Sequence, residues 1–175
     1  MNETLKTIFQ RKSVRIYQDK PISKDALELL VRAAMAAPSG ADTRSWSFII
    51  IQDKKMLESL AQGLKYGKML KKSGAAIIVC GNPEKSVFEG DQYWMFDCSI
   101  AAENILLAAE SIGLGAVWVS VYPNNLRIRN TKEILELPKD IEPLCVISLG
   151  YPKIEQKPKD KFDSKKMHWD KWKNI

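Results

Sequence analysis

A chain of 175 residues, 45% hydrophobic and 27% charged, has the size and composition of one globular domain. No apolar run reaches the roughly 20 residues of a membrane-spanning helix, and the N-terminus lacks the apolar stretch of a signal peptide, so we expect a cytoplasmic protein with no membrane partner. The net charge of +6 admits nucleic acid as a partner. Much of the excess, however, lies from Lys153 onward, where eight lysines stand against four acids.

The cysteines and the single histidine argue against several kinds of site. Cys80, Cys98 and Cys145 form no CxxC pair, and each lies among apolar residues, so we expect buried free thiols. One histidine, His168, cannot supply a multi-histidine metal site and weakens any Ser-His-Asp hydrolase proposal. We therefore expect no metal.

Hydrophobic spacing, capping residues and breakers predict an alternation of helices and strands. In chain order the predicted elements are helices over Glu3–Gln10 and from Ser23 to before Pro38, a strand over Trp46–Ile51, a helix from Asp53 through Leu60, a helical turn over Lys68–Lys72, a strand over Ala75–Cys80, a long helix over Asp91–Ile112, a strand over Ala116–Val121, a helix over Asn124–Leu137 and a strand over Pro143–Leu149. The three consecutive isoleucines of the first strand favour burial on both of its faces.

These elements predict an α+β protein, a three-layer α/β sandwich whose mixed sheet of four or five strands is flanked by helices. A doubly wound Rossmann fold is disfavoured, because no GxGxxG follows the first strand and two helices precede it. The long helix is apolar on more than one face, so it is central or buried against a partner chain. The polar tail, with Phe162, Trp169 and Trp172, must lie across its own domain or a second subunit.

Near the N-terminus, the segment Arg11-Lys12-Ser13-Val14-Arg15 combines three cations with a hydroxyl. In an extended chain, residues two apart share a face, so Arg11, Ser13 and Arg15 could converge on one ligand, with Lys12 pointing elsewhere. Guanidinium groups bind phosphate through paired hydrogen bonds, and the hydroxyl adds a donor. The same residues also fit a solvated surface, so the segment alone leaves both interpretations open.

A second motif, Ala37-Pro38-Ser39-Gly40-Ala41-Asp42-Thr43-Arg44-Ser45-Trp46, follows a predicted helix. It is either an ordinary helix stop and loop, or a turn of small residues that lets the backbone approach the edge of an aromatic ring. In the second case Asp42 and Arg44 could hydrogen-bond to that ring or to the first cluster.

These two motifs are followed along the chain by Gly113-Leu114-Gly115-Ala116-Val117-Trp118, by Leu149-Gly150-Tyr151-Pro152 and by the basic tail. In their order and spacing, these segments together resemble the FMN-dependent nitroreductase family over nearly the whole chain. The resemblance implies an intertwined homodimer with two FMN sites at its interface, each built from both subunits, and with the long helix forming much of that interface. It also implies one FMN-binding domain over residues 1–152, with residues 153–175 as a basic arm that packs on the partner.

The resemblance further implies which residues bind the cofactor. The phosphate, ribityl chain and ring edge of FMN would contact Arg11, Lys12, Ser13 and Arg15, with Lys159 and Lys161 of the tail reaching the phosphate. The ring would be approached from the other subunit by Pro38, Ser39 and Asp42, and would lie beside Val117, Trp118 and Val119.

The chain departs from the family pattern A-P-S-x-x-N-x-Q-P-W at Asp42, Arg44 and Ser45. A carboxylate in place of an amide only accepts hydrogen bonds, and its charge near the ring would lower the flavin reduction potential unless Arg44 neutralises it. The pocket-shaping insertion of larger members is absent. That leaves residues 63–72 and 87–94 as candidate lids, with Tyr66, Lys68, Tyr93 and Trp94 as candidate pocket residues.

The resemblance implies an enzyme in which FMN carries the chemistry and no side chain acts as nucleophile. NADPH or NADH would pass hydride to flavin N5 and leave, and a nitroaromatic, quinone or similar electron-poor acceptor would then bind, giving ping-pong kinetics. The stretch Lys65, Lys68, Lys71 and Lys72 either attracts the NADPH phosphate or is a solvated helix face.

Four alternatives or refinements stay open at this point. Within the same fold the chain could be a reductive dehalogenase or a flavin-fragmenting enzyme. It could also hold flavin without turnover. A basic nucleotide- or nucleic-acid-binding protein is the remaining possibility, with Trp169 and Trp172 stacking on bases. The basic residues are dispersed over several segments and form no known nucleic-acid motif, so we expect no nucleic-acid partner.

Overall fold

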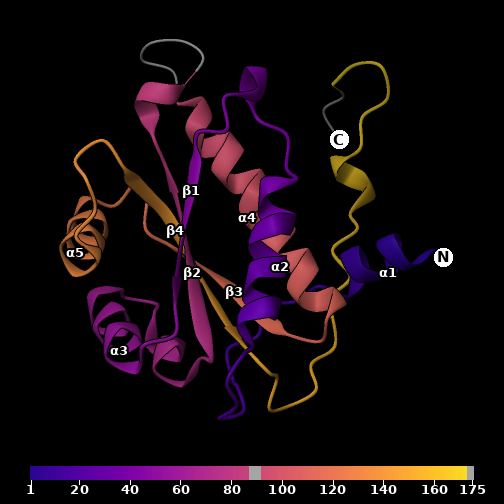
Figure 1. Ribbon diagram of the computed structural model, residues 1–175. Coiled ribbons are helices and arrows are strands. Elements are labelled where there is room, and N and C mark those ends of the chain that lie inside the picture. Colours follow the sequence, from indigo (N-terminus) through magenta and orange to yellow (C-terminus); the bar gives the residue numbers. More distant parts are fainter. Residues whose placement is uncertain (87–91, 173–175) are drawn as a thin grey trace.

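The computed structural model describes residues 1–86 and 92–172, where helices cover both faces of one four-stranded sheet (Figure 1). The strands are β1 (Trp46–Ile51), β2 (Ala75–Gly81), β3 (Gly115–Ser120) and β4 (Glu142–Gly150), in the spatial order β1-β2-β4-β3. The helices are α1 (Glu3–Gln10), α2 (Lys24–Met35), α3 (Lys54–Gly63), α4 (Tyr93–Ser111) and α5 (Asn125–Leu135).

Two hydrophobic cores, one on each face of the sheet, define the three layers. On one face, Ile77, Val79 and Ile147 pack with α2 and α4. Their neighbours along the strands, Ile78 and Val146, pack with α3 and α5 on the other face. The alternation follows from the two-residue repeat of a strand. The predicted three-layer α+β sandwich is therefore confirmed, and every predicted helix and strand lies within a few residues of its expected bounds.

Polar N-cap residues lie at the helix N-termini that the sequence predicts. The Ser23 hydroxyl accepts a hydrogen bond from the backbone N–H of Ala26 at 3.2 Å, and the Asp53 carboxylate accepts one from Met56 at 2.8 Å. Each cap satisfies a backbone donor that the first turn of the helix leaves without a partner, so both helices begin at a fixed residue.

The sheet differs from the prediction in two respects. All three strand ladders are antiparallel, so the mixed character that we expected is reduced to an isolated parallel bridge between Ser13 and Ala116. Burial of the first strand on both faces is also wrong, because β1 lies at an edge of the sheet and Ile50 is 44% exposed. The expected start of the long helix at Asp91 falls outside the described residues.

The long helix α4 connects the parts of the molecule. Small and aliphatic residues on one side of α4, among them Cys98, Ala101 and Ile105, are fully buried in the core. The Asn104 amide donates to the carbonyl of Ala33 at 2.9 Å and ties α4 to α2. On another side α4 leaves Phe96 and Ile100 exposed, as expected of a helix with more than one apolar face. None of the described helices has the length and hydropathy needed to cross a membrane.

Candidate functional site

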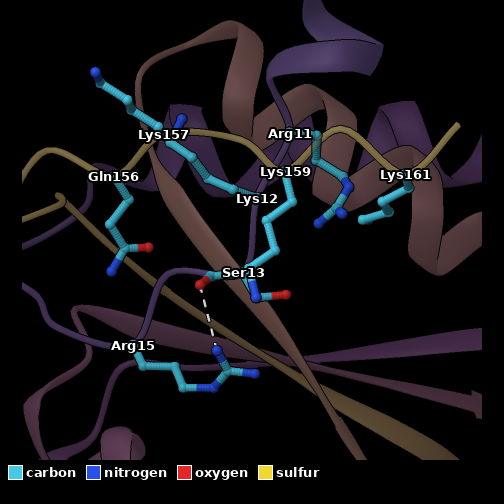
Figure 2. Close-up of a pocket in the computed structure, with 8 residues that line it drawn as sticks. All are labelled: Arg11, Lys12, Ser13, Arg15, Gln156, Lys157, Lys159 and Lys161. Carbon is cyan, nitrogen blue, oxygen red and sulfur yellow. Dashed lines mark hydrogen bonds between the residues drawn. The ribbon is translucent and has the colours of Figure 1, made fainter.

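A small cationic pocket of about 280 Å³ forms where the N-terminal motif meets the tail (Figure 2). Its walls carry only cationic or neutral polar side chains: Arg11, Lys12, Ser13, Arg15, Gln156, Lys157, Lys159 and Lys161. The pocket thus gathers six of the twelve residues that the sequence assigns to FMN. Such a set of donors suits a phosphate or another compact anion.

The N-terminal half of the pocket is fixed against the outer edge of β3. The backbone N–H of Val14 donates to the carbonyl of Ala116 at 2.9 Å, and the buried Tyr17 hydroxyl donates to the carbonyl of Val14 at 2.7 Å. Gly115 and Gly150 lie opposite each other in the β3–β4 ladder. A Cβ on Gly115 would lie 2.7 Å from that of Val14, and one on Gly150 would lie 2.6 Å from the Tyr17 ring. These two glycines let the motif lie directly on the sheet.

The tail reaches the pocket because its first residues pair with the chain just beyond the motif. Gln18 donates its backbone N–H to Tyr151 at 2.8 Å, and Lys153 donates to Ile16 at 3.0 Å. From there the tail passes over the pocket, and Lys159 reaches toward Ser13 in Figure 2. In Figure 1 the same segment rises beside α1.

Two of the pocket's cations are partly neutralised by acids of α4. Lys12, which we expected to point elsewhere, binds Glu110 at 2.8 Å, and Arg11 lies 3.5 Å from Glu103. Arg15 donates only a long hydrogen bond, of 3.4 Å, to the carbonyl of Ser13. Arg15, in contrast to Arg11 and Lys12, therefore has no acidic partner among the described contacts.

A second, larger hollow of about 590 Å³ adjoins the pocket and shares Arg15 with it. Its walls are more apolar, with Ile16, Tyr17 and Met69, and four cations surround it against the single acid Asp19. Lys68 and Lys72, from the basic turn after α3, are two of these cations, and the others are Arg15 and Lys153. A flat group with a negatively charged edge would match such walls.

The second motif forms a strained loop between α2 and β1. Ala41, Asp42 and Arg44 have positive φ angles of 46°, 56° and 50°. This left-handed conformation costs about 1–2 kcal/mol for an L-residue other than glycine, and it persists only where the surroundings hold it in place. Within the loop, the Ser39 hydroxyl accepts from the backbone N–H of Arg44 at 3.1 Å.

Asp42 and Arg44 bind each other rather than the first cluster. The guanidinium donates two hydrogen bonds to the carboxylate, at 2.9 and 2.7 Å, and the hydrogen bond lowers the pKa of Asp42. Both side chains are exposed, as is Pro38. The departure from the family pattern is therefore a neutral pair in this chain, as we considered from the sequence.

One site-building residue was missed. Asp97 of α4 is 3% exposed, and its carboxylate accepts hydrogen bonds from the backbone N–H of Gly40 at 2.9 Å and from the Ser45 hydroxyl at 2.8 Å. It thus holds both sides of the strained loop. A single acid on the buried side of an apolar helix was the signal in the sequence that could have revealed it.

The two motifs do not meet within one chain. Asp97 holds the loop, whereas Glu103 and Glu110 hold the first cluster farther along the same helix. At 1.5 Å per residue, Asp97 and Glu110 are about 20 Å apart along the helix axis. Pro38, Ser39 and Asp42 are therefore absent from the walls of the cationic pocket.

The third predicted group, on β3, divides between the two faces of the sheet. Val117 and Val119 are buried, and Val119 packs into the core beneath α3 and α5, while Trp118 packs at the α4 side. The indole N–H of Trp118 donates to the Ser120 hydroxyl at 2.9 Å. The carbonyl of Ala116 points to the outer edge of β3, where it accepts the hydrogen bond from Val14. Because backbone direction repeats every two residues in a strand, the N–H and C=O of Trp118 point to the same edge.

The candidate lids contribute unequally. Lys68 and Met69 line the larger hollow, but Tyr66 is exposed beside Arg127, away from its walls. Trp94 is buried against Tyr122 and lines neither the cationic pocket nor the larger hollow. Residues 87–91 of the other expected lid lie outside the described part of the chain.

The cysteines and the other candidate metal ligands form no metal-binding cluster in the described parts of the chain. Cys80, Cys98 and Cys145 are free and buried as predicted, and burial raises the pKa of each thiol, that of Cys80 to about 12. A thiolate is therefore disfavoured at neutral pH. Across residues 1–86 and 92–172, no group of three histidines, cysteines or acids could hold a metal ion.

Comparison with known proteins identifies the family. The model of the family described as "Nitroreductase family" matches residues 8–151. The chain belongs to the nitroreductase family. The match covers the first motif from before Arg11, the strained loop and the whole sheet, so the expected family is confirmed.

The relatives extend the likeness over the whole chain. A protein of Archaeoglobus fulgidus named "Putative NADH dehydrogenase/NAD(P)H nitroreductase" is 42% identical over 98% of this chain and 100% of its own. A crystal structure of the same name from Parabacteroides distasonis is 48% identical, with a TM-score of 0.94 over 98% and 100% of the two chains. An FMN-dependent nitroreductase from Clostridium difficile has 32% identity and a TM-score of 0.88 over 96% and 99%. The expectation of a NAD(P)H-dependent oxidoreductase is thus confirmed at the level of the enzyme class.

Proposed function

We propose that the protein is a cytoplasmic FMN-dependent oxidoreductase that takes hydride from NAD(P)H and passes it to a nitroaromatic, a quinone or a similar electron-poor acceptor. The observation that carries the proposal is the cationic pocket, in which Arg11, Ser13, Arg15, Lys159 and Lys161 converge from the two ends of the chain. Membership of the nitroreductase family and the relatives named for FMN and NAD(P)H support it.

The residues present fit the cofactor in shape and charge. Arg11, Ser13 and the two tail lysines offer donors to a phosphate, and no carboxylate lines that pocket. Past Arg15 the adjoining hollow offers apolar surface to a flat ring, while Lys68 and Lys72 suit a ring that carries negative charge when reduced. Bound there, FMN supplies the hydride chemistry, and the protein's residues bind and orient it.

A complete site needs a second copy of the chain. The loop that carries Pro38, Ser39 and Asp42 is held at the Asp97 end of α4, about 20 Å along the helix axis from Glu110, which binds Lys12 of the pocket. We therefore propose that these three loop residues approach the ring bound by the partner. Tyr93, Phe96 and Ile100 form an exposed apolar stripe at helical spacing on α4, and Leu5, Ile8 and Phe9 of α1 are also exposed. These surfaces suit burial in a homodimer, with residues 1–152 as the flavin domain and the tail from residue 153 packing on the partner.

The donor and the acceptor would stack on the ring in turn, in the part of the larger hollow that the ring leaves open. Two of the four lysines that we considered for the NADPH phosphate, Lys68 and Lys72, line it, which favours NADPH there over a purely solvated helix face. Alternate occupation of one hollow gives ping-pong kinetics, and no side chain has to act as a nucleophile.

The test is the visible spectrum of the purified protein with FMN, followed by anaerobic addition of NADPH. A flavin band that bleaches, and returns with a quinone, is expected. The matched pair is Arg11→Ala, which removes a pocket donor, and Arg129→Ala, which removes an exposed guanidinium of α5 beside Glu133. Only the first variant should lose FMN.

Other outcomes would redirect the proposal. A flavin band that persists with both NADPH and NADH would indicate a protein that holds flavin without turnover. A protein that binds no FMN would contradict the site, and binding of single-stranded nucleic acid by the tail would then be measured.

A further inference from the structure

We propose that Asp97 is a positioning residue that holds the loop Ser39–Ser45 in the conformation in which it meets the flavin ring of the partner. The inference rests on the proposed function for the identity of the ligand. The contacts between Asp97 and the loop stand independently of it.

The contacts of Asp97 span the loop. One carboxylate oxygen accepts from the backbone N–H of Gly40 at 2.9 Å, where the loop begins. The other accepts from the hydroxyl of Ser45 at 2.8 Å, where the loop enters β1, with the Thr43 hydroxyl 3.5 Å away. Asp97 and Ser45 are both buried, so water competes little for these hydrogen bonds.

The loop needs such an anchor because its own conformation is unfavourable. Ala41, Asp42 and Arg44 are all left-handed, and none of them is a glycine. Other links within the loop are local and would move with it: the exposed Asp42–Arg44 pair, the Ser39–Arg44 hydrogen bond, and the backbone hydrogen bonds from Asp42 to Ser39 and from Thr43 to Gly40. Of the described contacts, those of Asp97 fix the loop to a rigid helix of the core.

Loss of the anchor would lower the fraction of chains whose loop is ready to bind. Apparent affinity falls in proportion to that fraction, even where the residues touching the ligand are unchanged. Because Arg11 and Lys12 contact Glu103 and Glu110, and Asp97 is absent from the walls of the cationic pocket, binding of phosphate there should stay intact.

The experiment compares Asp97→Ala and Asp97→Asn with the unaltered protein, in two readouts. In protein freed of FMN, amide hydrogen exchange of residues 40–45 should rise at least tenfold in Asp97→Ala. The FMN Kd should rise about 10- to 100-fold, as expected for the loss of hydrogen bonds to a buried charged group. Asp97→Asn keeps an acceptor for Gly40, so it should restore part of both effects.

Two controls separate positioning from general loosening of the fold. Gln52→Ala removes an amide that donates to the carbonyl of Ile22 at 2.8 Å, a comparable tie between distant segments, and should leave both loop exchange and FMN affinity unchanged. Inorganic phosphate, used as the probe of the cationic pocket, should bind Asp97→Ala within twofold of its normal affinity.

Unchanged exchange of residues 40–45 in a folded Asp97→Ala protein would overturn the inference. If that variant does not fold, Ser45→Ala removes one of the same hydrogen bonds from the loop side, and it should raise both the exchange and the FMN Kd by about fivefold; no change in either would be equally decisive. Should the unaltered protein bind no FMN, the proposed function fails while the exchange measurement still tests the anchor.

Discussion

Tyr17 helps to fix the position of the cationic pocket. Its hydroxyl donates to the carbonyl of Val14 at 2.7 Å and lies 3.2 Å from that of Ser148, so it joins the motif to the centre of the sheet. We expect Tyr17→Phe to lower the free energy of unfolding by about 1–2 kcal/mol, since a buried carbonyl loses its donor. Chemical denaturation measures this loss, and Tyr66→Phe, at an exposed tyrosine, should cost nothing measurable.

The same tyrosine predicts a difference in stability at high pH. Burial raises the pKa of Tyr17 from 10.0 to about 12. A raised pKa gives stability that is fully present below pH 10 and lost as the pH rises through 12, and two pKa units correspond to about 2–3 kcal/mol. Relative to Tyr17→Phe, the unaltered protein should lose this amount between pH 10 and 12. Parallel denaturation curves for the two proteins over that interval would contradict the assignment.

Arg44 stabilises the ionised form of its neighbour Asp42. The hydrogen bond from Arg44 holds the pKa of Asp42 below its usual value, so Arg44→Ala should raise it. Carbon NMR of the carboxyl group during an acid titration follows the change. Arg32→Ala removes a similarly exposed pair with Glu28 and should leave Asp42 as it was. If Asp42 titrates identically in Arg44→Ala, the pair does not form in solution.

Residues near each other in sequence were easier to predict than those joined by the fold. Arg11, Ser13 and Arg15 share a face of one extended segment, and the resemblance supplied Lys159 and Lys161, so most of the pocket was named in advance. Asp97 was missed because its partners Gly40 and Ser45 lie 57 and 52 positions away in the sequence, and no pattern within α4 indicates which residues it contacts.

Among the elements, β3 and β4 shape the site because Gly115 and Gly150 have no side chain and so leave room for the N-terminal motif. A methyl group on Gly115 would approach the Cβ of Val14 to 2.7 Å and push the motif off the sheet. We expect Gly115→Ala to destabilise the protein by about 1–3 kcal/mol and to weaken FMN binding as well. Thermal unfolding and FMN titration check the two effects.

The matched substitution is Gly63→Ala at the end of α3. There the nearest atom is the terminal methyl of Ile134, at 3.2 Å, which can move aside. Alanine should be tolerated at that position, with no loss of FMN affinity. A Gly115→Ala protein as stable as Gly63→Ala would show that the motif does not lie against the sheet as described.

The bounds of the helices followed from capping residues such as Ser23 and Asp53, whose action is local. The exposure of β1 could not be read in that way. Three isoleucines look the same in an edge strand and a central one, and only the order β1-β2-β4-β3 decides which it is. The antiparallel pairing likewise depends on which strands meet across the sheet, a property of the whole chain.

At the scale of the whole molecule, one helix organises both halves of the candidate site. The acids of α4 are Asp97, Glu103 and Glu110, and each binds one of the two motifs. If the homodimer forms as proposed, light scattering should give twice the chain mass of 19.9 kDa. Phe96→Glu combined with Ile100→Glu should halve that mass and abolish FMN binding, because a charge opposes burial of the apolar stripe.

Leu126→Glu is the control for the assembly, since Leu126 is a comparably exposed apolar residue on α5, across the sheet from α4. It should leave both the mass and the FMN affinity unchanged. A dimer that survives the double substitution would place the interface elsewhere.

The attachment of the N-terminal motif to the sheet also has a consequence for the order of folding. Tyr17 and Ser148 are 131 positions apart, so their contact closes a loop that spans most of the chain. Contacts of such long range form late and slowly. We therefore expect the pocket to be the last part of the protein to assemble. In a refolding experiment, uptake of flavin would then report completion of the native state, well after the helices have recovered their circular dichroism.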